Sequence, residues 1–343
     1  MAGGASGEFA LARYLSDGTL DPSFGDEGKV TTLFTEGEAY AGSVVIQADG
    51  KIVVAGLAAD GFALARYLSD GTLDSSFGDE GKVATAFGGT GTLAPGLALR
   101  ANGKIVVVGT ANRKFALATY NTDGTLDSSF GNEGKVTTDF TTGLDYAIAA
   151  ANEVGGKIVV VGRAGYRGFA LARYRRNGAL DPSFGEKGKV RTFFGPDYIR
   201  ASADDVAIQA DGRIVAAGWA GHNYVHFALA RYETDGTLDS SFGRNGKLRT
   251  DIGRNAEAAE GVAIQANGKI VAAGMAGYFR KFAVARYKPD GTLDSSFGNG
   301  GRVTTSFGAG DVVAWGLALQ ANGMIVTAGQ AGGAFAVGRY LAA

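Results

Sequence analysis

The sequence predicts an all-β protein, a six-bladed β-propeller with four antiparallel strands in every blade. A segment that reads FALARYLSDGTLDPSFGDEGKVTT from Phe9 recurs along the chain, at spacings of 53, 53, 54, 58, 55 and 53 residues. A fixed period of this length is typical of a repeat architecture. Each unit also holds four short segments rich in Val, Ile, Leu, Phe and Tyr, which is the composition of strands. Six such units fit a closed propeller better than an open β-solenoid, which needs polar end caps.

The first complete unit shows the expected strands in order. They are residues 43–48 (SVVIQA), 51–56 (KIVVAG), 62–67 (FALARY) and 82–85 (KVAT). An Asp-Gly, Asn-Gly or Gly-Gly pair joins the first two strands in all six copies, and these pairs favour a two-residue type I′ hairpin. No window has a helical apolar period, so we expect very little helix.

A longer segment, DGTLDSSFGDEG, joins the third strand to the fourth. We expect Asp74 to cap a short helical turn that Gly78 ends. The alternative for this repeated aspartate, calcium binding, is disfavoured because the acidic residues that follow it change from copy to copy. Phe77 is expected to fill the space between neighbouring units.

The two ends of the chain decide how the ring closes. There are seven FALARY-like segments but only six copies of the other strands, because both ends carry one. We expect residues 29–32 to be the fourth strand of the last blade, beside residues 335–340, since this pairing removes an exposed edge. Residues 9–14 are then expected to lie outside the ring.

Composition narrows the class of protein. Lys plus Arg is 33 and Asp plus Glu is 34, so the net charge of −1 disfavours a nucleic-acid partner. There is no cysteine, no apolar run near the roughly 20 residues of a membrane span, and no signal-peptide pattern at the start. We expect one domain over residues 1–343, a monomer, with no cofactor.

The motifs LDxSFGxxG, GKV, ADGKIVVAG and FALARY resemble the bacterial delta-sixty repeat family. The resemblance spans nearly the whole chain and departs most at residues 152–160, where NEVGGKIVV replaces QADGKIVV. It implies a β-propeller, implies no single chemistry, and favours an extracellular or cell-surface location.

The links at one end of the blades differ in every copy, whereas those at the other end barely change. Variable loops on a constant scaffold are where binding usually resides. The links from strand two to strand three carry Arg163, Tyr166, Arg167, Trp219, His222, Asn223, Tyr224, His226, Tyr278, Phe279, Arg280 and Lys281. The links between blades carry Tyr40, Asp145, Tyr146, Asp197, Tyr198, Arg200, Asp204, Asp205, Arg254, Glu257, Glu260, Asp311 and Trp315.

We expect a non-catalytic module that binds a carbohydrate or a polar peptide on this variable end. Trp219, Tyr224, Tyr278 and Trp315 would stack on the ligand, and Arg163, Tyr166, Asp204, Asp205, His222, Arg280 and Asp311 would contact it. The alternative is a hydrolase or lyase that uses His222 with a carboxylate pair from Asp204, Asp205, Glu260 or Asp311. A structural spacer is a third class, and a solvent-exposed role is open for each of these side chains. His222 and His226 lie four residues apart in an expected loop, which disfavours a shared metal.

Overall fold

The computed structural model describes residues 1–34, 38–58, 61–88, 93–195, 200–253, 256–308 and 310–341, and every regular element within them is a β-strand. The 26 strands form seven antiparallel sheets. The all-β prediction is confirmed, and no helix in the described residues could span a membrane. The chain divides into two compact units, unit 1 (residues 1–160 and 174–179) and unit 2 (residues 161–173 and 180–343).

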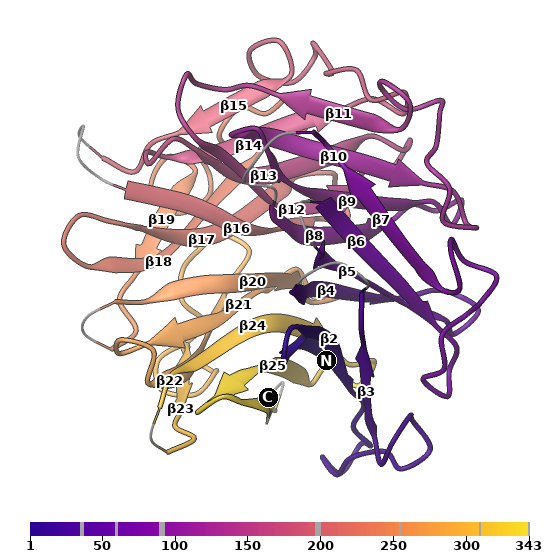
Figure 1. The fold of residues 1–343 in the computed structure, drawn as a ribbon. Helices are drawn as coiled ribbons and strands as arrows, with labels where there is room; N and C mark the ends of the chain where they lie inside the picture. The colour runs from indigo at the N-terminus through magenta and orange to yellow at the C-terminus, as the bar shows by residue number, and fades with distance from the viewer. Residues whose placement is uncertain are drawn as a thin grey trace. The chain divides into compact units, whose positions relative to one another are not determined.

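The sheets follow one another along the chain (Figure 1). The first three are β1 (Ala2–Ala5), β2 (Glu8–Ala12) and β3 (Lys29–Thr32); β4 (Ala39–Ile46), β5 (Ile52–Ala58), β6 (Gly61–Tyr67) and β7 (Lys82–Ala86); and β8 (Leu93–Leu99), β9 (Ile105–Ala111), β10 (Lys114–Tyr120) and β11 (Lys135–Thr138). The next two are β12 (Asp145–Asn152), β13 (Ile158–Ala164), β14 (Phe169–Tyr174) and β15 (Lys189–Thr192); and β16 (Arg200–Ile208), β17 (Ile214–Gly221), β18 (Val225–Tyr232) and β19 (Lys247–Thr250). The last two are β20 (Ala258–Ile264), β21 (Ile270–Ala276), β22 (Lys281–Tyr287) and β23 (Arg302–Thr305); and β24 (Val312–Leu319), β25 (Ile325–Ala331) and β26 (Ala334–Tyr340).

The prediction of six blades is wrong, because the N-terminal FALARY copy builds a sheet of its own. β2 pairs with β3, with Phe9 opposite Thr32, and β1 pairs with the other edge of β2. The expected pairing of residues 29–32 with residues 335–340 is therefore absent, and residues 9–14 do not lie outside the fold. β2 and β3 are joined by one short connection, so their pairing closes a far smaller loop than a pairing with the C-terminal strand would.

The C-terminal sheet has three strands in the described part of the chain. β26 pairs with β25, as predicted for residues 335–340, but no described strand covers its outer edge. Its residues are mostly half-buried, whereas β6 and β14 are buried throughout. A strand with one neighbour instead of two keeps part of its surface in solvent.

The turn between the first two strands of a sheet differs from the predicted type. Gly50 has a φ of 85°, but Asp49 is not among the residues with positive φ, which a type I′ turn would require. The N–H of Gly50 donates to the carbonyl of Gln47 at 2.9 Å, and the N–H of Gln47 donates to that of Lys51 at 2.8 Å. This is a type I turn followed by one left-handed residue, so the same Asp-Gly pair serves a longer loop than expected.

The LDxSFG segment is a hydrogen-bonded turn and not a helical one. Oδ1 of Asp74 accepts the N–H of Ser76 at 3.1 Å, which confirms its capping role. Phe77 is fully buried in a cluster with Val53 of β5 and Ile105 of β9, which confirms that it fills the space between sheets.

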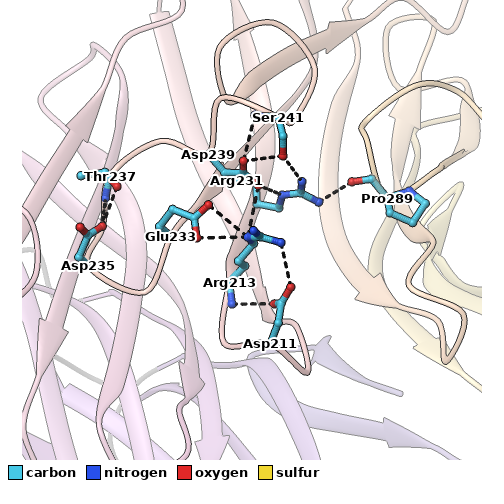
Figure 2. Close-up of polar contacts among 9 residues, drawn as sticks. All are labelled: Asp211, Arg213, Arg231, Glu233, Asp235, Thr237, Asp239, Ser241 and Pro289. Carbon is cyan, nitrogen blue, oxygen red and sulfur yellow. Dashed lines mark hydrogen bonds and ion pairs between the residues drawn. The ribbon is translucent and has the colours of Figure 1, made fainter.

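The arginine of FALARY ties this turn to the next repeat, a role that the sequence did not reveal. Figure 2 shows one of the copies in unit 2: Nε of Arg231 donates to Oδ2 of Asp239 at 2.7 Å, and another nitrogen donates to the backbone carbonyl of Pro289 in the following repeat. The guanidinium also lies 4.7 Å from the ring centre of Phe242. Arg213 adds a second cation 3.5 Å from Asp239. The same arginine–aspartate pair occurs at Arg13, Arg66, Arg173 and Arg286.

The tyrosine that ends FALARY makes a second contact between sheets. The hydroxyl of Tyr232 donates to Oγ1 of Thr192, on β15 of the preceding sheet, at 2.8 Å. Tyr67 and Thr32 repeat this contact at 2.7 Å, and burial raises the pKa of Tyr67 to about 12. These two contacts explain why FALARY and KVTT barely vary between copies.

Candidate functional site

The first strand of several sheets carries a β-bulge at the same place, and the extra residue differs from sheet to sheet. It is Gly42 in β4, Asp204 in β16, Glu260 in β20 and Trp315 in β24. β20 packs between β16 and β24 (Figure 1). Asp204, Glu260 and Trp315, the bulge residues of unit 2, therefore occupy equivalent positions on three neighbouring strands. Bulges commonly re-aim a side chain next to a functional site.

Asp204 has the most perturbed surroundings of the predicted site residues. Burial raises its pKa to about 7; a hydrogen bond from Ser202 and the charge of Arg163 oppose the rise, and the charge of Asp205 adds to it. Its Oδ1 accepts the Ser202 hydroxyl at 2.7 Å, whereas its Oδ2 is enclosed and has no hydrogen-bond partner within the described ranges. Part of the residue remains accessible to solvent.

Two further carboxyl groups join Asp204. Burial raises the pKa of Asp205 to about 6, although its oxygens accept N–H groups of Val206 and Val262, each at 2.8 Å. Burial also raises the pKa of Glu260 well above its ordinary value, and the charge of Asp204 raises it further. We call Asp204, Asp205 and Glu260 the carboxyl cluster. A group with a pKa near neutrality can both donate and accept a proton at pH 7.

An aromatic and guanidinium stack lies on the neighbouring strands. The Arg200 guanidinium lies 5.9 Å from the ring centre of Tyr166 and 6.0 Å from that of Trp219, and Arg163 lies 5.7 Å from Tyr166. Tyr166 is 60% exposed. The prediction that Trp219 lies in a loop is wrong: it belongs to β17, is half-buried, and packs against Met275 and its neighbours.

Tyr224 and Tyr278 meet from two separate loops, as the predicted aromatic surface requires. Their ring centres are 6.4 Å apart and the rings are edge-on at 72°. Each side chain is 51% exposed. Tyr278 and Phe279 have φ angles of 54° and 60°, a left-handed conformation that is uncommon outside glycine.

The remaining predicted residues stay outside the carboxyl cluster. His222, Arg280 and Asp311 are exposed, and none of them is among the groups that shift the pKa of Asp204, Asp205 or Glu260. Trp315 is 50% exposed. Asp197, Tyr198 and Arg254 lie outside the described residues.

Cavities lie away from this site. One of about 680 Å³ in unit 1 is lined by Lys51, Arg66, Arg100 and Asp123, at the constant end of the sheets. One of about 510 Å³ in unit 2 is lined by Ile252, Asn299 and Arg302. Neither of these two cavities is lined by a residue of the carboxyl cluster.

Sequence reasoning missed one group of possible ligands. His226, Asp251 and Glu257 place a nitrogen and two carboxylate oxygens within 4.8 Å of one another. His226 lies on β18 and not in a loop, so its distance in sequence from His222 says nothing about a metal. A comparison of the repeats at the residue before FALARY would have been the signal, because that position holds glycine, alanine or a charged residue in the other copies and a histidine only here.

Comparisons with known structures give the same fold class. A protein from Lactobacillus plantarum has a TM-score of 0.57 at 13% identity, over 98% of this chain and 92% of that chain. A catalytically inactive virginiamycin B lyase from Staphylococcus aureus, solved with quinupristin, has a TM-score of 0.54 at 10% identity, over 91% and 87%. A protein of unknown function from Dyadobacter fermentans has a TM-score of 0.52 at 11% identity, over 87% and 93%. At these identities the likeness shows the fold alone.

The sequence comparisons identify a family. No curated protein sequence matches the chain. The family model described as "Domain of unknown function (DUF5122) beta-propeller" matches residues 2–24, 47–77, 100–130, 156–184, 209–242 and 265–297. The match covers more than half of the chain, so the chain belongs to this β-propeller family.

Proposed function

We propose that this member of the β-propeller family binds a carbohydrate on the variable end of unit 2. The observation that carries the proposal is the row of bulge residues, which sets the half-exposed indole of Trp315 in line with the carboxyl groups of Glu260 and Asp204. A sugar ring offers an apolar face to stack on an indole and hydroxyl groups to bond with carboxyl oxygens. Asp204 remains partly accessible to solvent, so a ligand hydroxyl can approach this residue.

The surrounding side chains extend this surface. Tyr166 and the Tyr224–Tyr278 pair add exposed aromatic faces, and Arg200 adds donors between Tyr166 and Trp219. Aromatic rings give contact area at a small cost in side-chain entropy, and arginine is enriched beside them at binding hot spots. A polar peptide would use the same stacking faces, so peptides form the second arm of the test.

A glycan array and a peptide array test the proposal on the whole chain. We expect glycan binding that is lost in Trp315→Ala and weakened in Asp204→Asn. Ile46→Ala is the matched control, because Ile46 is 70% exposed and lies in unit 1. Binding of peptides alone, or glycan binding that survives Trp315→Ala, would contradict the proposal.

A second candidate function is acid–base catalysis by the carboxyl cluster. It is favoured by the pKa values of Asp204 and Asp205, raised to about 7 and about 6. Such groups are matched to proton transfer near neutral pH. A hydrolase and lyase panel, run with Asp204→Asn, Glu260→Gln and His222→Ala, separates the two functions. Wild-type turnover that is lost in Asp204→Asn and Glu260→Gln but kept in His222→Ala would establish catalysis by the carboxyl cluster. If the wild type shows no turnover, binding is the function that remains.

The proposal includes location and oligomeric state. We propose that the chain acts outside the cytoplasm or at the cell surface, where polymeric carbohydrates are accessible, and that it acts as a monomer. Cell fractionation and light scattering of the purified protein test these two statements. Recovery in the cytoplasm, or a stable dimer, would contradict them.

A further inference from the structure

Three side chains of types that commonly bind metal ions lie close together in unit 2, beside the edge of the sheet formed by β16–β19. His226 lies on β18, Asp251 follows β19, and Glu257 precedes β20. Each offers an atom, and these atoms all lie within 4.8 Å of one another. Nδ1 of His226 is 3.6 Å from Oε2 of Glu257. This nitrogen is enclosed, and the described residues offer it no hydrogen-bond partner.

Backbone groups fix the carboxylate of Glu257. Its Oε2 accepts the N–H of Ile252 at 2.9 Å, and its Oε1 accepts that of Gly253 at 2.6 Å. Glu257 is fully buried. A carboxylate oxygen of Asp251 lies within 4.8 Å of one of Glu257. Two carboxylates held this close together repel each other and favour a cation between them.

Unit 1 contains the same arrangement, with a lysine ammonium group in the place of the imidazole. Lys114 precedes Phe115 as His226 precedes Phe227, and Asp139 follows β11 as Asp251 follows β19. The Lys114 ammonium lies 3.0 Å from Oδ2 of Asp139.

The residue of unit 1 that corresponds to Glu257 is also a buried carboxylate held by backbone N–H groups. The carboxylate of Asp145 accepts the N–H groups of Phe140 and Thr141, at 2.8 and 3.1 Å, as Glu257 accepts those of Ile252 and Gly253. The unit 1 site thus holds the permanent positive charge of a lysine between its carboxylates. The unit 2 site holds an imidazole in the same place, and a neutral imidazole supplies no positive charge. A metal ion bound to this imidazole would supply the positive charge that the lysine supplies in unit 1.

We propose that His226, Asp251 and Glu257 bind a Zn²⁺ ion. One imidazole nitrogen and two carboxylate oxygens are a donor set that zinc accepts, with metal–ligand distances of about 2.0–2.2 Å. Bringing the three atoms to that distance requires small rotations, and Asp251 is exposed and can make them. Ile252, whose N–H donates to Glu257, also lines the cavity of about 510 Å³.

Calorimetric titration of the EDTA-treated full chain with ZnCl₂ tests the proposal. We expect one equivalent of Zn²⁺ to bind the wild type and no Mg²⁺ to bind, because magnesium prefers oxygen ligands and keeps its waters. The variant His226→Lys reproduces the unit 1 arrangement, so it should fold normally and lose the site. Absence of zinc binding in the folded wild type would overturn the proposal, as would equal binding in His226→Lys.

The reciprocal variant makes the test sharper. Lys114→His gives unit 1 the same donor types, with Asp139 and Asp145 in place, so its stoichiometry should rise from one to two Zn²⁺. A variant that stays folded and still binds one ion would show that the shared geometry does not define the site.

The sequence provides an internal spectroscopic control, since it contains only two histidines. In an ¹⁵N NMR titration, zinc should shift the ring resonances of His226 and leave those of the exposed His222 unchanged. A shift confined to His222 would contradict the assignment. If His226 responded to pH and not to zinc, the missing charge would be a proton, and the metal site would be refuted.

Discussion

Asp239 and Asp204, both in unit 2, are aspartates enclosed by protein whose surroundings differ. Desolvation pushes the pKa of Asp239 up, but hydrogen bonds from Ser241 and Arg231 outweigh it and hold the pKa below its usual value. Asp204 accepts one side-chain hydroxyl, and burial raises its pKa to about 7. The aspartate of the LDxSF turn has its own arginine in five of the six copies, and in the copy with Thr119 in place of that arginine Asp127 pairs with Lys104 instead. The aspartate at the variable bulge is poorly compensated. A buried carboxyl group that the fold does not need is a candidate for function.

The largest expected effect on stability comes from removing the arginine that compensates the buried charge of Asp239 at the constant end of the sheets. Arg231→Ala leaves Asp239 buried and takes away the link to Pro289, so we expect a loss of about 3–5 kcal/mol in the free energy of unfolding. Denaturant unfolding at pH 7 measures it. Arg213→Ala is the control, since Arg213 is 37% exposed and lies further from Asp239, and it should cost under about 1 kcal/mol. Equal losses would show that the buried pair is not what holds the repeats together.

At the variable end the opposite substitution should stabilise the protein. Asp204→Asn removes a charge that burial disfavours, so we expect a gain of about 1–3 kcal/mol at pH 8. Because the pKa of Asp204 is raised in the folded state, the folded protein binds more protons than the unfolded one between about pH 4 and pH 7. Wild-type stability should therefore fall across that window as pH rises, and the variant should show a smaller fall. Identical slopes would mean that Asp204 is not buried in solution.

The constant end was also the part that sequence predicted best. Strand identity, the capping role of Asp74 and the burial of Phe77 follow from composition and spacing, which act locally. The predicted number of blades depended on whether β3 pairs with β2 or with the C-terminal strand. The composition of a strand does not determine which strand it pairs with. The strand β1 reads AGGA, without a single large apolar residue, so no propensity argument would have found it.

At the candidate site, sequence found the residues but not their surroundings. Variation between copies singled out Asp204, Glu260 and Trp315 as members of variable links. Their shared bulge depends on register, which appears only when the strands are paired. The sequence predicts that the second strand ends at Gly218, the glycine of RIVAAG, which puts Trp219 in a loop, whereas β17 extends to Gly221. His226 stayed inconspicuous because Asp251 and Glu257 approach it only in three dimensions.

A smaller effect is expected from the second constant contact. Tyr232→Phe removes the hydroxyl that donates to Thr192 between two sheets, so the free energy of unfolding should fall by about 1 kcal/mol. Adding Thr192→Val should recover part of this loss, because the second substitution removes the buried hydroxyl left without its partner. If the double variant loses about a further 1 kcal/mol in its free energy of unfolding relative to the single variant, each hydroxyl has a separate partner.

The smallest effect on stability is expected from the exposed aromatic pair, and there the comparison between scaffold and surface is most direct. Tyr224→Ala removes a ring that is 51% exposed and meets Tyr278 edge-on at 6.4 Å, so the free energy of unfolding should change by no more than about 0.5 kcal/mol. Trp219→Ala, in which a half-buried ring packed against Met275 is lost, should cost several times more. If the variable end is a binding surface, Tyr224→Ala should nevertheless weaken glycan binding, since a ring that contributes little to folding is free to contribute to a ligand. Unchanged stability together with unchanged binding would remove Tyr224 from the proposed surface and restrict the ligand to the row of bulge residues.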